Sequence, residues 1–111
     1  MEKRVYERLP VRVKIKYYLR NPLFWNNLYK GTIKNLSEKG MFISTKTIYF
    51  PRDSLVEIFI PFNKKGVYLP ANISNIVWRN ILSDNSCDGI GINISKPPRE
   101  YLEFVENLRA T

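Results

Sequence analysis

The chain has 111 residues, of which 44% are hydrophobic and 14% aromatic, enough apolar surface for the core of one folded domain. Eighteen Lys and Arg against ten Asp and Glu give a net charge of +8. Residues 1–30 hold eight of the basic and two of the acidic residues, so this segment carries +6 and residues 31–111 carry +2. A local excess of this kind is typical of proteins with anionic partners, although surface charge also serves solubility alone.

The composition excludes several kinds of chemistry. Histidine is absent and Cys87 is the only cysteine, so a disulfide within the chain is impossible and zinc or iron–sulfur sites lack their usual ligands. No apolar run approaches the length of a membrane span, and the charged residues at 2–8 leave no hydrophobic stretch for a signal peptide. We therefore expect a cytoplasmic protein that holds no metal and no cofactor.

The polar residues also argue against catalysis. The most versatile general base is missing, and Cys87 lies between Ser86 and Asp88 with no positive charge nearby to lower its pKa. A buried structural thiol at a strand start is the better interpretation. The most closely spaced carboxylates, Glu100, Glu103 and Glu106, recur every three residues of a predicted helix and read as its solvated face. The sequence thus predicts no enzyme.

Most of the chain has the pattern of short strands. Residues 11–20 alternate strictly between apolar and polar positions, which predicts a strand with one buried face, and Asn21 and Pro22 end it. A second strand is predicted through Tyr29 and Ile33. Further β-branched and aromatic runs are Met41–Ser44, Leu55–Ile60, Val67–Leu69, Ile73–Trp78 and Gly89–Ile94. Several short strands at regular spacing predict a small antiparallel barrel or sandwich.

Only the last segment changes its period. Four apolar residues there, Tyr101, Phe104, Val105 and Leu108, follow the spacing of one helical face. We expect a helix over residues 95–110 that packs this stripe on the barrel. Ser95 is its predicted cap, and the prolines at 97 and 98 suit a first turn.

Two clusters of polar residues suggest a binding site. Arg4 and Arg8 precede the first strand, and paired guanidinium groups suit bidentate bonding to phosphate or to the edge of guanine. The second cluster, residues 35–40, lies between two strands and reads Asn-Leu-Ser-Glu-Lys-Gly. In an extended chain Asn35 and Ser37 point the same way, and Gly40 permits a positive φ or a close approach to the backbone. Each cluster alone is ordinary surface or turn composition.

Together, RxxxR at residues 4–8 and NxSxxG at residues 35–40 resemble the cyclic di-GMP signature of the PilZ domain family. The resemblance covers nearly the whole chain, including a strand ending in Val-Trp at Trp78 and a Gly-Ile-Gly-Ile strand before the terminal helix. It implies an all-β fold, a six-stranded antiparallel β-barrel with a C-terminal α-helix. The corresponding division is one domain of residues 1–111, with an arm at 1–9, the barrel at 10–94 and the helix at 95–110.

The resemblance also implies roles for individual residues. Arg4 and Arg8 would clasp phosphates and guanine edges, Asn35 and Ser37 would bond a guanine, and Gly40 would provide the turn. Asn35 stands where aspartate is common, and its amide offers one acceptor oxygen where a carboxylate offers two.

Two further positions are weaker candidates for the same site. Lys3 stands where many family members have arginine, a position that bears on whether one nucleotide or a stacked pair binds. Trp78 either stacks on a guanine as an exposed indole or belongs to the core.

Three functions follow from these patterns. The leading hypothesis is a bacterial cyclic di-GMP receptor that relays the signal to a protein partner in motility, pilus, polymer synthesis or transcription. We expect residues 2–9 to become ordered when the ligand binds. The alternative is a small basic barrel that binds RNA or single-stranded DNA. The third is a PilZ-like adaptor that binds only protein.

Overall fold

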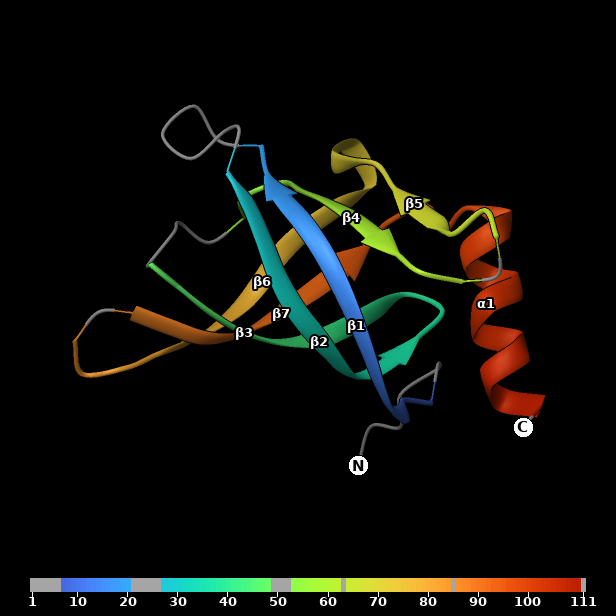
Figure 1. Cartoon of the computed structure of the whole chain (residues 1–111), viewed down its shortest axis with the longest axis horizontal. Coiled ribbons are helices and arrows are strands. Elements are labelled where there is room, and N and C mark those ends of the chain that lie inside the picture. Colours follow the sequence, from blue (N-terminus) through green and yellow to red (C-terminus); the bar gives the residue numbers. More distant parts are fainter. Residues whose placement is uncertain (1–6, 21–26, 49–52, 63, 85, 111) are drawn as a thin grey trace.

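A computed structural model shows one curled antiparallel sheet with a helix at its side (Figure 1). The structure describes residues 7–20, 27–48, 53–62, 64–84 and 86–110. Its elements are β1 (Leu9–Leu19), β2 (Leu28–Ser37), β3 (Gly40–Ile48), β4 (Val56–Ile60), β5 (Val67–Leu69), a 3-10 turn (Ala71–Ile73), β6 (Ser74–Ile81), β7 (Ser86–Ile94) and α1 (Arg99–Ala110). The strand order is β5-β4-β1-β2-β3-β7-β6, and Figure 1 shows β1 and β2 crossing in front of β6 and β7.

The sheet curls until the segment before β4 reaches β6. Leu55 forms an isolated antiparallel bridge with Asn75, and the amide of Ile76 donates to the carbonyl of Ser54 at 2.9 Å. These bonds tie the two sides of the sheet together over a short stretch. The interior of the curl therefore holds the core, and the exterior is available for ligands.

The alternation of β1 matches the prediction. Ile15, Tyr17 and Leu19 are buried inside the curl, whereas Lys14 and Lys16 are exposed on its outer face. This is the expected result for a strand whose side chains alternate between a core and solvent. The same inner face continues on β4, β5 and β7.

The predicted fold class is confirmed, with seven strands in place of the expected six. The additional strand is short: β5 has three residues and pairs only with β4, at the edge of the sheet. Its sequence, Val67–Leu69, is one of the apolar runs identified above. Tyr68 points outward between two buried residues, so even this short strand has two distinct faces.

The terminal helix begins at Arg99, later than predicted, and the proposed Ser95 cap is wrong. The amide of Ser95 instead donates to the carbonyl of Ile73 at 2.9 Å. The residue before a proline disfavours helical dihedrals, so Lys96 and Pro97 lie outside the helix, which starts after Pro98. The predicted apolar stripe is confirmed, because Tyr101, Phe104 and Val105 are buried and Leu108 packs beside them.

Tyr101 also makes a buried polar contact between α1 and the sheet. Its hydroxyl is buried and donates to the carbonyl oxygen of Ser37 at 2.6 Å. Burial raises the pKa of this phenol, which therefore remains a neutral donor. The helix is thus bonded to the end of β2.

We expect Tyr101→Phe to lower the free energy of unfolding by about 1–2 kcal/mol, because a buried carbonyl loses its donor. Urea denaturation measures this change. Tyr68→Phe is the matched control, since its hydroxyl donates to Glu57 at the surface. Equal losses from the two variants would contradict the role assigned to Tyr101.

Candidate ligand-binding site

The end of the N-terminal arm and the end of β2 meet at Arg8. Pro10 of β1 pairs with Asn35 of β2, which brings the residue before β1 next to the second sequence motif. The Arg8 Nη1 donates to the Oδ1 of Asn35 at 2.7 Å, across 27 residues of sequence. The structure therefore brings together one residue from each predicted motif.

Gly40 is required for space, and its predicted role as the turn residue is wrong. The turn consists of Glu38 and Lys39, while Gly40 is the first residue of β3 and pairs with Ser37. Among the described glycines, Gly66 alone has a positive φ. A Cβ on Gly40 would lie 2.6 Å from the carbonyl oxygen of Ile92 and 3.8 Å from the Nη2 of Arg8. The absent side chain lets β7 approach on one side and the guanidinium on the other.

Ser37 is buried at the turn, one strand position beyond Leu36. Its Oγ accepts a hydrogen bond from the amide of Lys39 at 3.3 Å, a local contact that shapes the turn. Its backbone carbonyl is the acceptor for Tyr101. The hydroxyl and the carbonyl oxygen of Ser37 therefore both hold the turn in place, and direct contact with a ligand stays a prediction.

Arg109, near the end of α1, joins the two motifs through their backbone and side chains. Its guanidinium forms a bidentate pair with Glu38 of the turn, at 3.1 and 2.9 Å. It also donates to the carbonyl oxygen of Glu7, next to Arg8. Sequence reasoning missed this residue, because nothing in the local pattern of a helical arginine indicates a partner 71 residues away.

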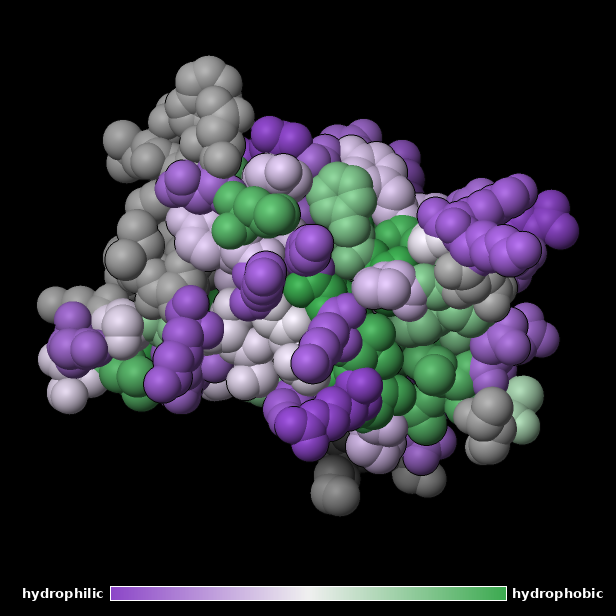
Figure 2. Space-filling view, viewed as in Figure 1, coloured by the Kyte–Doolittle hydropathy of each residue, from purple (hydrophilic) through white to green (hydrophobic). Residues whose placement is uncertain are grey.

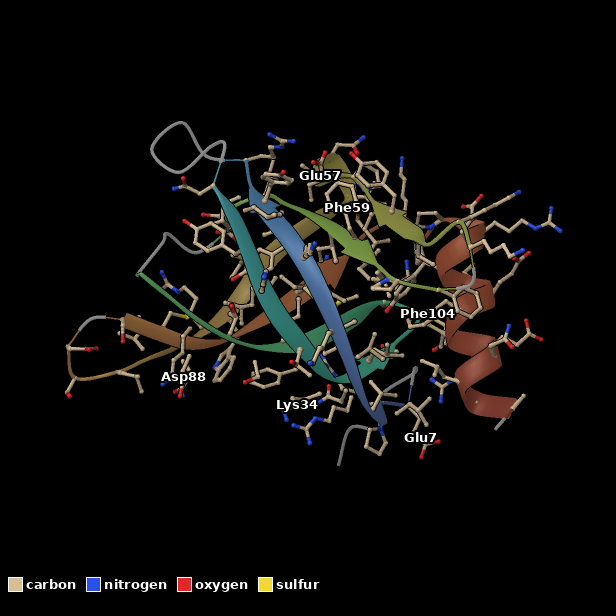
Figure 3. All side chains as sticks on the ribbon, in the orientation of Figure 1. Glu7, Lys34, Glu57, Phe59, Asp88 and Phe104 are labelled. Carbon is tan, nitrogen blue, oxygen red and sulfur yellow. The ribbon has the colours of Figure 1, made fainter. Side chains whose placement is uncertain are left out.

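The predicted ordering of residues 2–9 on ligand binding concerns an arm whose last residues already contact the rest of the protein. Glu7 and Arg8 each have a protein partner, in Arg109 and Asn35. Residues 2–6, including the predicted site residues Lys3 and Arg4, lie outside the described residues. In Figure 3, Glu7 and Lys34 mark the end of the sheet at which the site lies.

Aromatic side chains extend the site along one row of the sheet. Asn35 pairs with Phe42, Phe42 with Gly91, and Gly91 with Trp78, so these residues cross four strands in register. Directly paired residues point to the same face, and here the rings of Phe42 and Trp78 lie 5.5 Å apart over the glycine. Trp78 is 49% exposed, which excludes the core alternative.

Phe42 is a second residue that sequence reasoning missed. It lies between Asn35 and Trp78, three strand spacings apart at about 4.8 Å each, and so it is the aromatic ring nearer to the polar cluster. The signal was present in the sequence. Phe42 falls between the apolar Met41 and Ile43, which are both buried, so strand alternation predicts an outward-pointing ring two residues after Gly40.

The acidic residues and the cysteine are the sequence's candidates for chemistry, and the structure shows where the described ones lie. Within the described ranges, no three His, Cys, Asp or Glu residues gather as metal ligands would. Cys87 is buried and its thiol donates to the carbonyl oxygen of Gly89 at 3.2 Å. The three glutamates of α1 are exposed, as predicted.

The model of the PilZ domain family matches residues 2–108, so the chain belongs to the PilZ domain family. Its fold is similar to the PilZ domain of YcgR from Escherichia coli, solved with c-di-GMP, at TM-score 0.69, 12% identity, and coverage of 98% of this chain and 93% of that one. It is also similar to the Bacillus subtilis inhibitor of motility MotI/DgrA, at TM-score 0.70 and 10% identity, covering 99% of this chain.

The chain spans about half (51%) of the length of the MotI/DgrA chain. No curated protein matches the sequence.

In the described part of the chain, no helix is both long and apolar enough to cross a membrane.

The ion pair of Glu38 and Arg109 gives the site a testable pH dependence. The Arg109 guanidinium holds the pKa of Glu38 below its ordinary value, so the pair stabilises the fold above that value and is lost as the pH falls through the lowered pKa. We expect Glu38→Gln to cost about 0.5–1 kcal/mol at pH 7 and nothing in strong acid. Urea denaturation at several pH values measures the difference. A constant difference down to acid pH would contradict the ion pair.

Proposed function

We propose that this chain is a receptor for cyclic di-GMP that binds the dinucleotide with Arg4, Arg8, Asn35, Ser37 and Gly40. The observation that carries the proposal is the 2.7 Å bond from Arg8 to Asn35, which unites the RxxxR and NxSxxG motifs at one end of the sheet. Membership in the PilZ domain family and the fold shared with a PilZ domain solved with c-di-GMP support the same ligand.

The polar groups at this end of the sheet match the chemistry of the ligand. A guanidinium group bonds both to phosphate oxygens and to the O6 and N7 acceptors of guanine. The Asn35 amide supplies an acceptor for guanine N–H groups and a donor for its oxygen. Arg8 already points at Asn35, so binding the ligand requires it to share or exchange one hydrogen bond. Lys3 adds charge for the phosphates.

The aromatic row supplies a surface for a base. Phe42 and Trp78 are outward rings on the same face as Asn35, and stacking of a base on such a ring is worth about 1–3 kcal/mol. Phe42 lies closer to the polar cluster and Trp78 is more exposed. We therefore include both with the site.

The receptor transmits its state through α1. Arg109 contacts Glu38 and the backbone of Glu7, so a ligand that moves either motif changes the position of α1 on the sheet. A protein partner that contacts α1 would sense this change without any catalytic step by the domain. The fold shared with an inhibitor of motility supports a partner from the motility machinery.

We expect Arg4→Ala and Arg8→Ala each to weaken cyclic di-GMP binding by about 1.5–3 kcal/mol, the worth of a charge-assisted hydrogen bond. Isothermal titration calorimetry measures the affinity. Arg12→Ala is the control, because Arg12 is exposed on β1 and carries the same charge outside the motif. An equal loss from Arg12→Ala would reduce the effect to net charge and contradict the proposed site.

Asn35 separates recognition of guanine from attraction to phosphate. We expect Asn35→Asp to keep or improve affinity for cyclic di-GMP, because a carboxylate accepts two guanine N–H groups, and Asn35→Ala to lose affinity. Calorimetry with both variants tests this. If Asn35→Asp instead weakened binding as the added negative charge would against a phosphate backbone, the guanine contact would be wrong.

A further inference from the structure

A wide groove lies where β1, β2 and β3 face the segment from β4 to β5, and neither Arg8 nor Asn35 lines it. Its lining combines outward-pointing residues with buried ones such as Ile15, Ile60 and Val67. Its volume is about 1,130 Å³, and β1, β2, β3 and the segment from β4 to β5 line it. Six lysines surround it: Lys14, Lys16, Lys30, Lys46, Lys64 and Lys65. One acidic residue, Asp88, also lines it, so the groove is strongly positive.

The lysines of this groove are available for a ligand. All six are exposed, and none pairs with an acidic side chain within the described ranges. Figure 2 shows hydrophilic side chains projecting from the face of β1 and β2, with hydrophobic surface between them. Unpaired like charges so close together repel one another, and an anionic ligand would relieve this repulsion.

Two lysines and two aromatic residues that line the groove form one row across four strands. Lys30 pairs with Lys16, Lys16 with Phe59, and Phe59 with Tyr68, on β2, β1, β4 and β5 in turn. Paired residues share a face, so all four side chains point outward. The rings of Phe59 and Tyr68 lie 5.1 Å apart and are 39% and 48% exposed.

The acidic residue beside the rings does not oppose an anion strongly. Glu57 accepts from the Tyr68 hydroxyl and pairs with Arg20 at 2.6 Å. Its charge is therefore balanced within the protein. Figure 3 shows Glu57 and Phe59 on β4, far from Glu7 at the opposite end of the sheet.

We infer that this groove binds a single-stranded nucleic acid, with the lysines along its phosphates and Phe59 and Tyr68 stacked on its bases. Non-specific single-strand sites combine a positive groove with aromatic platforms, and this row has both. An acidic peptide would satisfy the lysines but leave the exposed rings without a planar partner. A duplex would hide its bases from the rings.

This inference stands apart from the cyclic di-GMP site. It assigns the alternative predicted from the sequence, a basic barrel that binds RNA or single-stranded DNA, to a different surface of the domain. Arg8 does not line the groove. Arg8→Ala should therefore leave oligonucleotide binding within twofold of wild type. The proposed cyclic di-GMP site and the proposed nucleic-acid groove can thus each be contradicted without affecting the other.

The test is fluorescence anisotropy with a labelled oligo-dT and an oligo-U of about 12 nucleotides, within the usual range of site sizes. We expect binding at low salt by the wild-type chain, with a steep loss as salt rises. Replacing Lys16 and Lys30 together by glutamine should weaken binding about 10-fold and flatten the salt slope by about 1.4. The matched control replaces Lys34 and Lys96, two exposed lysines outside the groove.

The rings are tested by Phe59→Leu, which keeps an apolar side chain but removes the platform. We expect about a 5-fold loss of affinity or more, against less than twofold for Trp78→Leu outside the groove. Thermal melting confirms that each variant is folded. No binding by the wild type at low salt would overturn the inference. An equal loss of affinity in the control lysine variant would also overturn it. So would a poly-glutamate peptide that binds as tightly as the oligonucleotides and binds the Phe59→Leu variant equally well.

Discussion

The attachment of α1 to the turn between β2 and β3 determines where the site residues lie. Tyr101 donates a buried hydrogen bond to the carbonyl oxygen of Ser37, and Arg109 forms an ion pair with Glu38 at the surface. The same guanidinium donates to the backbone carbonyl of Glu7. The helix therefore contacts one residue within each motif, Glu7 in residues 4–8 and Glu38 in residues 35–40. The pairing of β1 with β2 brings Arg8 to Asn35, and the contacts of α1 fix the segments on either side of that bond. If the chain binds its ligand at these motifs, as proposed, the contacts of Arg109 couple that site directly to the helix.

The sequence predicted the elements whose pattern is local. Strict alternation identified β1 and its buried face, and the spacing of Tyr101, Phe104 and Val105 identified the packed face of α1. The start of the helix was wrong because two opposing properties of proline, its tolerance in a first turn and its restriction of the preceding residue, compete at residues 96–98. The pattern alone does not decide between them.

The site was predicted only in part, because its contacts cross long distances in sequence. Arg8 and Asn35 were identified as members of one site and do meet. Gly40 was assigned to the turn, since a glycine that makes room for Ile92 looks the same in sequence as one with a positive φ. Arg109 acts through a partner 71 residues away, which becomes visible only when the chain is folded. Phe42 differs, because strand alternation alone could have predicted its outward-pointing ring.

Arg8 lies at one end of the sheet, and six of the described lysines line a separate groove. The most direct test of the central claim is therefore a titration of the ¹⁵N-labelled protein with cyclic di-GMP, followed by amide shifts in NMR spectra. The account predicts that the amides of residues 7–8 and 35–42 and the terminal turn of α1 shift, while those of Lys16, Lys30 and Phe59 do not. Shifts confined to the lysine groove, with residues 35–42 unchanged, would contradict it.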